Sequence, residues 1–344
     1  MKTGKPKSEN LLTIFIALLC LLTSSKASAK KNNETTQMDK SACGSTVDLR
    51  SKMPPIRNQG DIGWCYAHVS ADLLSYRYRQ NISAADIALK YNQIFMQQLE
   101  YAVKGLFSSF TLTPAQTKRD GGYLDLALDN SMKNGFCLEK DLPSNAVNGN
   151  LKTIQEFRAL EKLIYEIREK TNVAQDCAEH YEKTQKLFPN LTPSEFETIL
   201  ANDGPSKIIT DLASVTCKNR QYFKNNPEID SIKSFAHSDA EIFKIITKQL
   251  DKNNILGIEY NTAFLKGQKK PLTRIEKYFG GHASSIIGKR WSENKKTCEF
   301  LLRNSYGPSC SYYAEPYKSS CEAGNIWVDS DSILKALSGL VYLK

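Results

Sequence analysis

Residues 58–67, Asn-Gln-Gly-Asp-Ile-Gly-Trp-Cys-Tyr-Ala, form a glycine-containing turn that leads directly into Cys65. Beyond this cysteine, apolar residues recur at a helical period as far as about Gln80, which predicts a helix that begins at Cys65. The unpaired N–H groups and the dipole at a helix N-terminus favour an anion, so they are expected to lower the pKa of the Cys65 thiol. A lone cysteine is more often a packing residue, so a reactive thiol also requires partners elsewhere in the chain.

Three further segments carry such partners. Residues 120–123, Asp-Gly-Gly-Tyr, precede an amphipathic stretch at 124–132, and residues 279–283, Phe-Gly-Gly-His-Ala, precede an apolar strand. Residues 300–307, Phe-Leu-Leu-Arg-Asn-Ser-Tyr-Gly, end another apolar strand on an asparagine. With the first turn, these segments resemble the motifs of the papain-like cysteine peptidases, in the order that the family has them and over most of residues 47–330.

The resemblance implies a role for four residues. Cys65 is the nucleophile, and His282 lies across a cleft, holds it as a thiolate–imidazolium pair and later protonates the leaving amine. Asn304 accepts from the imidazole and fixes its tautomer. Gln59 donates its amide to the oxyanion beside the backbone N–H of Cys65. The implied activity is that of a cysteine-type endopeptidase, which hydrolyses a polypeptide substrate through an acyl-thioester, with no cofactor and no metal.

The resemblance also implies a substrate-binding set, which consists of Gly121, Gly122, Tyr123, Gly281 and Tyr306. Gly122 is expected to pair with the substrate backbone. Tyr123 is expected beside the second non-primed pocket, which we expect to be apolar. Tyr306 stands where the family has tryptophan, so it keeps an aromatic shield and adds a hydroxyl.

The implied fold is α+β, with a mainly helical N-terminal half and an antiparallel, barrel-like β half. The peptidase domain is expected at 47–344, and its parts are a helical half at 47–150, a helical insertion at 151–235 and a β half at 236–344. The insertion follows from spacing, since 217 positions separate Cys65 from His282 against about 130 to 150 in the family. It either covers the cleft, docks a partner or inhibitor, or forms a helical layer on the far surface.

Residues 1–29 have the pattern of a secretory signal peptide. Lys2, Lys5 and Lys7 precede an apolar run at 11–22, and Ala-Ser-Ala at 27–29 offers a cleavage site. The run is too short to span a bilayer, so we expect no membrane anchor. We expect a secreted or periplasmic protein, or one of a lysosomal-type compartment in a eukaryote. The remaining tail, 30–46, is too short for a helical inhibitory prosegment.

Composition narrows the class of protein. The chain has 344 residues, of which 41% are hydrophobic and 24% charged. This balance predicts a globular protein with a sizeable core, and it excludes disordered, collagen-like and disulfide-only chains. The formal charge of +9 is mild for this length. The sequence also lacks a basic stripe interleaved with aromatic residues, so we expect no nucleic-acid partner.

Seven cysteines remain outside the signal peptide and the nucleophile, and such an odd set cannot be paired from sequence alone. Export to an oxidising compartment favours disulfides among them. We expect a bridge between Cys310 and Cys321 and one between Cys177 and Cys217. The alternative for the first pair is a zinc site shared with Cys298, which no histidine or Cys-x-x-Cys spacing supports.

Other functions remain open on the same scaffold. The chain is either an active peptidase, a catalytically silent binding protein, or another thiol acyl transferase or amidase that acts on cell-wall peptides. The complete set of four site residues argues against the silent alternative. His68, one helical turn beyond the nucleophile, is interpreted as structural, because a base must approach the thiol from across the cleft. His180 and His237 are interpreted as solvated surface residues.

Overall fold

The computed structural model describes residues 39–60, 63–91, 121–144, 181–182, 184–185, 191–202, 211, 214–215, 217–267 and 281–344. The expected signal peptide, the possible cleavage site, most of the insertion at 151–235, His180 and Cys177 lie outside these ranges. The domain boundaries therefore stay predictions. Within the ranges described, every helix is too short or too polar to cross a membrane.

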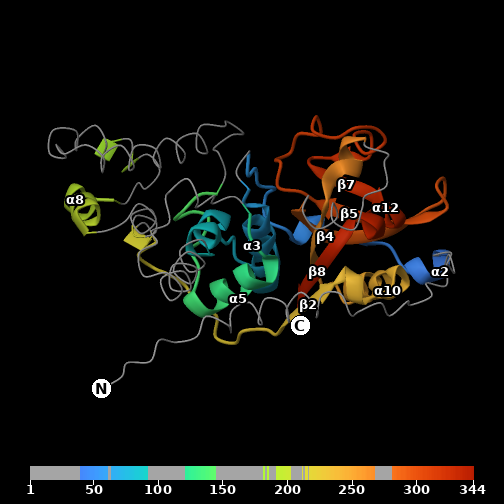
Figure 1. The fold of residues 1–344 in the computed structure, drawn as a ribbon, viewed down its shortest axis with the longest axis horizontal. Coiled ribbons are helices and arrows are strands. Elements are labelled where there is room, and N and C mark those ends of the chain that lie inside the picture. The colour runs from blue at the N-terminus through green and yellow to red at the C-terminus, as the bar shows by residue number, and fades with distance from the viewer. Residues whose placement is uncertain are drawn as a thin grey trace, which may run out of the picture. The chain divides into compact units, whose positions relative to one another are not determined.

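The helix predicted after the first turn is α3 (Cys65–Tyr78). It begins at Cys65 and ends at Arg79, which adopts a left-handed conformation with φ of 56°. Helix α5 (Leu124–Asn134) coincides with the predicted amphipathic stretch and lies beside α3 (Figure 1). Residues 84–91 are also helical. These helices form the mainly helical half of an α+β fold.

The other helices are shorter or lie farther along the chain, and they are α2 (Lys40–Cys43), α8 (Pro193–Asn202), α10 (Asp239–Asp251), α12 (Ser330–Ala336) and the 3₁₀ turns η1 (Arg50–Lys52), η4 (Ser234–Ala236) and η5 (Thr262–Lys266). Several of them begin at side-chain caps, as α10 and α12 show. Ser238 and Glu241 form a reciprocal capping box on α10. Asp329 accepts from the backbone N–H of Ser332 at 2.8 Å and so fixes the start of α12.

The β half is one antiparallel sheet of eight strands. Its strands are β1 (Val47–Asp48), β2 (Ile229–Lys233), β3 (Leu256–Asn261), β4 (Gly281–Ser292), β5 (Thr297–Arg303), β6 (Cys321–Glu322), β7 (Asn325–Asp329) and β8 (Leu337–Leu343). Their order is β2-β8-β3-β4-β5-β7-β6, and β1 pairs with β4. The strand register places Tyr260 of β3 opposite His282 of β4, so the predicted base sits inside the sheet near one strand end.

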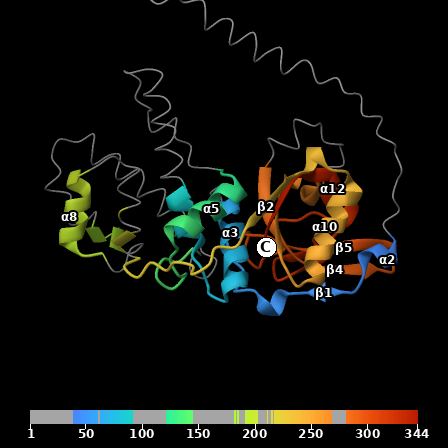
Figure 2. The ribbon, with the colours of Figure 1, turned by 90° about the horizontal axis from the view of Figure 1, so that it is seen from below.

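Helices cover both faces of this sheet. Side chains alternate between the faces along each strand, so Leu301 of β5 joins the core around α3, while Phe300 and Leu302 join the core under α10 and α12. Figures 1 and 2 show α3 on one side of the strands and α10 on the other. Strand β8 is buried on both faces, and its sequence is accordingly mostly apolar.

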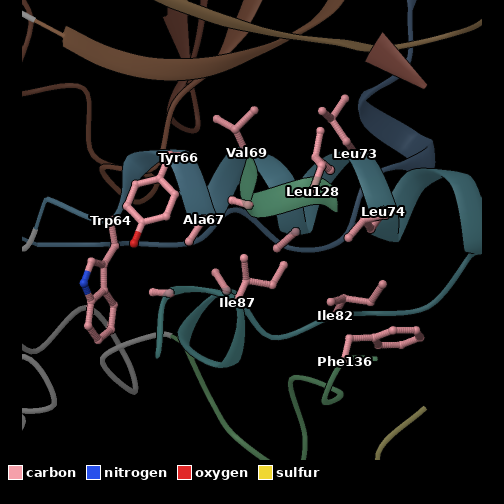
Figure 3. Packing of buried hydrophobic residues seen from close by; sticks show 14 of the residues in the cluster. Trp64, Tyr66, Ala67, Val69, Leu73, Leu74, Ile82, Ile87, Leu128 and Phe136 are labelled. Carbon is pink, nitrogen blue, oxygen red and sulfur yellow. The ribbon is translucent and has the colours of Figure 1, made fainter. Parts of the chain in front are cut away.

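The hydrophobic core around α3 is tightly packed and fixes the helix that begins at Cys65. Val69, Leu73 and Leu74 of α3 belong to one cluster with Leu128 of α5 and Ile82. Figure 3 shows Val69 and Leu73 on one side of the helix and Leu74 on the other, toward Ile82. All of these side chains are buried. Full burial of one such side chain stabilises the fold by roughly 1.5–3 kcal/mol. The position of Cys65 is therefore set by the packing of the helix that follows it.

Three disulfides lie among the described residues, and they join Cys43 to Cys298, Cys137 to Cys217, and Cys310 to Cys321. The predicted Cys310–Cys321 bridge is confirmed. The predicted Cys177–Cys217 bridge is wrong, because Cys217 reaches back to the segment after α5 instead. The zinc alternative fails as well, since all three of its sulfurs are in disulfides.

Candidate active site

A cavity of about 310 Å³ opens where the start of α3 meets β3, β4 and β8. Cys65 and His282 both line it, so the two residues expected to react lie at one site although they come from opposite halves of the fold. Four of the five expected substrate-binding residues line it too, namely Gly121, Gly122, Tyr123 and Gly281. Asn304, Gln59 and Tyr306 are not in its lining and reach the site through contacts described below.

Cys65 is the free cysteine of the described part of the chain. Burial raises the pKa of its thiol, against a smaller lowering by the backbone N–H groups of Ala283 and Tyr66, and the charge of Glu259 raises it further. The expectation of a lowered thiol pKa at the helix start is therefore wrong for the free protein, because desolvation outweighs the favourable N–H groups. The thiol is protonated until a base takes its proton.

His282 is held in one tautomer by Asn304. Its Nε2 lies 2.7 Å from Oδ1 of Asn304, and the same oxygen accepts from the backbone N–H of Ser305 at 2.8 Å. That second bond identifies the atom as the amide oxygen, so Nε2 must carry the proton. Nδ1 is then the unprotonated nitrogen that can accept the thiol proton.

Burial also shapes the basicity of His282. The side chain is 8% exposed, and burial lowers its pKa to about 4, against a smaller raising by its bond to Asn304. Burial therefore disfavours the expected resting thiolate–imidazolium pair, because desolvation penalises the charge on Cys65 and the charge on His282. The neutral thiol and neutral imidazole are the forms that burial favours.

Tyr306 packs against the imidazole of His282. Its ring stacks on the imidazole at 4.9 Å between centroids and 29° between planes. Its hydroxyl lies 3.5 Å from Nδ1 of His282, at the limit of hydrogen bonding. Tyr306 therefore contacts the base rather than the cavity.

Gln59 is anchored to the strand end that carries Asn304. Its backbone N–H donates to the carbonyl of Ser305 at 2.7 Å, and its side-chain oxygen accepts from the Ser305 hydroxyl. Because that oxygen is occupied by a donor, the amide nitrogen is the end of the side chain that is suited to donate. Sequence reasoning missed Ser305, although it lies inside the motif at 300–307.

Close packing explains two glycines at this site. A Cβ on Gly122 would lie 2.7 Å from the Tyr66 ring, and one on Gly257 of β3 would lie 2.4 Å from Leu124. Real Cβ atoms do not approach so closely, so both positions need glycine. The second contact brings β3 against the start of α5.

The far wall of the cavity is polar. It contains Glu259 and Lys233, whose charged atoms lie 3.5 Å apart, together with Phe235 and Ser338. Glu259 also accepts from the backbone N–H of Leu124 at 3.1 Å. The apolar character expected of the second non-primed pocket stays a prediction. Glu259 directly follows the apolar run 255–258, and this carboxylate was the sequence signal that could have predicted the polar wall.

A buried ion cluster joins the two sides of the cleft. Asp72 of α3 binds Arg57 at 2.7 Å and Arg303 of β5 at 2.9 Å. Arg303 also donates to the carbonyls of Pro54 and Pro55. The cluster therefore ties the helix of the nucleophile to the strand that ends at Asn304.

His68 and His237, the other histidines of the described residues, do not line the cavity. His68 is buried in α3, and burial lowers its pKa to about 3. His237 is partly exposed, 3.9 Å from Glu241. Among the described residues, the one cluster of metal-ligand type is Asp86 with Cys137 and Cys217, whose sulfurs are bonded to each other and whose carboxylate binds Arg220.

Comparisons with known proteins find similar solved structures but no matching sequence. No family model and no curated protein matches the chain. The chain is similar to a solved stem bromelain precursor, with 12% identity, a TM-score of 0.44 and coverage of 89% of this chain and 72% of that one. It is also similar to the digestive procathepsin L 3 of Tenebrio molitor, with 10% identity, a TM-score of 0.43 and coverage of 86% and 69%.

A third solved structure is the bromelain protease from Ananas comosus in complex with the E64 inhibitor, with 11% identity, a TM-score of 0.41 and coverage of 87% of this chain and 98% of that one. The likeness that the motifs imply is therefore found. Such low identities and TM-scores assign neither activity nor substrate, so the chemistry must be argued from the site itself.

Proposed function

We propose that the protein is a papain-like cysteine endopeptidase that cleaves peptide bonds through an acyl-thioester on Cys65. The observation that carries this proposal is the 2.7 Å contact between Nε2 of His282 and Oδ1 of Asn304, in a histidine that shares one cavity with a free thiol. A histidine held in this tautomer presents an unprotonated nitrogen, which is what a general base for a thiol requires.

The reaction follows from these groups. As the sulfur of Cys65 attacks the substrate carbonyl, its proton moves to Nδ1 of His282. The backbone N–H of Cys65 and the amide of Gln59 donate to the oxyanion that forms, and loss of one such donor costs roughly 2.7–4 kcal/mol of barrier stabilisation. Collapse breaks the C–N bond, and the leaving amine takes the proton from His282. Water then attacks the thioester, with His282 again as base. The C–S bond breaks, the acid is released, and the proton returns from His282 to the sulfur of Cys65.

The buried neutral pair suits this sequence of steps. Because burial penalises both charges, we expect the proton to move to His282 as the bond forms at sulfur. The orientation of the imidazole remains fixed throughout, since Asn304 is uncharged and holds Nε2 in both protonation states.

Secretion is part of the same proposal. Three disulfides fit an oxidising compartment, and the signal-peptide pattern at 1–29 supports export. The segment 151–235 stays a candidate for a lid, a partner surface or a remote helical layer.

A peptidase assay tests the function. The purified protein should cleave internally quenched peptides, and mass spectrometry should find new termini without any product joined to an added amine. Cys65→Ala and His282→Ala should abolish cleavage, whereas His237→Ala, a matched change of a partly exposed histidine, should leave it unchanged. Products formed mainly with the added amine would instead identify an acyl transferase, and cleavage that survives Cys65→Ala would overturn the proposal.

A further inference from the structure

A second and larger cavity, of about 740 Å³, lies away from the candidate active site. It is formed where the C-terminal ends of α3, α10 and β8 meet η1. Cys65 begins α3, and Arg77 and Arg79 lie at its other end, which is about 20 Å away at 1.5 Å per residue. The two cavities therefore occupy opposite ends of one helix.

The lining of this second cavity is strongly cationic. It contains six basic residues, namely Lys52, Arg77, Arg79, Lys248, Lys252 and Lys344, and no aspartate or glutamate of the described residues lines it. Of the six, Lys344 alone has an ion-pair partner in the described chain, and it pairs with Glu228 at 2.9 Å and Asp230 at 3.4 Å. Like charges gathered in one concave surface focus a positive potential that attracts anions.

Helix ends account for only part of this charge. The C-termini of α3 and α10 both meet the cavity, and each helix end carries about half a negative charge that nearby cations stabilise. Two ends therefore offset about one cation, whereas six are present. The excess positive charge points to an external anion.

The two arginines are positioned by backbone oxygens and an aromatic ring. Arg77 donates to the backbone oxygen of Lys344 at 3.2 Å. Arg79 donates to the carbonyl of Lys52 at 3.4 Å and lies 4.5 Å from the centre of the Tyr76 ring. An arginine has five N–H donors, so these contacts orient the guanidinium groups and leave donors for a ligand.

The chemistry of the lining selects among anionic ligands. Its aromatic rings, Tyr76 and Tyr342, are buried, so they offer no exposed platform on which nucleic-acid bases could stack. Its one aliphatic residue, Leu343, is buried as well, so nothing apolar protrudes to enter a lipid surface. The exposed groups are ammonium, guanidinium and amide donors, which suit sulfate and hydroxyl oxygens.

We propose that this cavity, at the end of α3 remote from Cys65, binds a segment of a sulfated polysaccharide. Sulfate groups contact the lysines and arginines, and sugar hydroxyls contact the amides of Asn253 and Asn254. Binding there retains the protein on a sulfated matrix while the cavity that contains Cys65 stays open to substrate. The proposal goes beyond peptide-bond cleavage and does not depend on it.

The test measures binding of a fluorescent heparin hexasaccharide by anisotropy in about 0.15 M salt. A triple variant, Lys52→Gln/Lys248→Gln/Lys252→Gln, removes three exposed cations. Within the described residues, their side chains make no hydrogen bond or ion pair. The matched control is Lys140→Gln/Lys224→Gln/Lys318→Gln, which changes three exposed lysines outside the cavity and lowers the net charge equally. Circular dichroism and melting temperature check that both fold.

The proposal predicts that the sulfated hexasaccharide binds and that its desulfated form does not. The cavity variant should bind roughly threefold to 150-fold more weakly, because three exposed contacts of about 0.2–1 kcal/mol each are lost. The control variant should stay within about twofold of the natural protein, since its lysines lie outside the cavity.

Three results would overturn it. Equal weakening by both variants would mean diffuse charge rather than a site. Binding of oligo(dT) or tripolyphosphate as tight as that of the hexasaccharide would mean a general polyanion or phosphate site. No binding of the hexasaccharide would mean that the cations serve only the helix ends and the fold.

Discussion

The Tyr306 hydroxyl lies 3.5 Å from Nδ1 of His282. This nitrogen is the one that must accept the thiol proton. A hydroxyl that donates there stabilises the neutral imidazole and opposes protonation. Tyr306→Phe keeps the stacked ring and removes the donor, so the acidic limb of kcat/KM, expected near pH 4, should move upward. A net hydrogen bond of about 1 kcal/mol corresponds to at most about 0.7 pH unit. An unmoved limb would show that the hydroxyl does not bond to Nδ1.

Glu259 provides a second test at this scale. Its charge contributes to the raised pKa of Cys65, and Glu259→Gln keeps an acceptor for the N–H of Leu124. The thiol pKa should therefore fall, and alkylation by iodoacetamide at a fixed pH below that pKa should become faster. Glu293→Gln, which changes an exposed carboxylate outside the cavity, is the control. Equal alkylation rates in the natural protein and Glu259→Gln would contradict the assigned charge effect.

At the scale of elements, the Asp72 cluster holds α3 against β5. Removal of one partner leaves the others charged and buried, which typically costs about 3–5 kcal/mol. Asp72→Asn should lower the free energy of unfolding by about that amount, as measured in urea. Asp129→Asn breaks the exposed pair with Lys133 and should change it by less than about 1 kcal/mol. Similar losses in the two variants would show that the cluster does not stabilise the fold.

The elements also show what the sequence could predict. Helices α3 and α5 and strands β4 and β5 each carry their own period and end signals, so they and the residues at their ends were predictable. The Asp72–Arg303 pair was not, because its members lie 231 positions apart and each looks like an ordinary charge in sequence. Cys217 was wrongly paired for the same reason, since nothing local marks Cys137 as its neighbour.

At the scale of the whole molecule, burial of neutral histidines links stability to pH. The folded-state pKa is lowered to about 4 for His282 and about 3 for His68, against about 6.5 in the unfolded chain. The unfolded chain then binds more protons below pH 6.5, so stability is complete above that pH and falls as the pH drops toward the folded values. The slope is up to about 1.4 kcal/mol per pH unit for each histidine.

His68→Leu removes one of these two contributions. Urea unfolding between pH 7 and pH 4.5 should show a slope with pH that is shallower by up to about 1.4 kcal/mol per pH unit. His237→Gln, at a partly exposed histidine, should leave the slope unchanged. An unaltered slope in His68→Leu would contradict the burial of a neutral imidazole at this position.

At this scale, the charged residues of both cavities could not be predicted from the sequence, because folding brings them together from distant positions. The six cations of the basic cavity come from residues 52, 77, 79, 248, 252 and 344, so the sequence contains no basic run to reveal them. The polar wall near Cys65 likewise needs the pairing of β3 with β8 and the approach of β3 to α5. Charge that is assembled by folding leaves little trace in local composition.

The central claim, a reactive thiol at Cys65 activated by His282, is tested most directly by covalent labelling. An epoxide affinity inhibitor of papain-like enzymes is added to the reduced, purified protein, and adducts are located by intact mass and peptide mapping. The account predicts one adduct per chain, on Cys65, that disappears in Cys65→Ala and is strongly reduced in His282→Ala. A folded protein that remains unlabelled, or that labels equally well without His282, would contradict it.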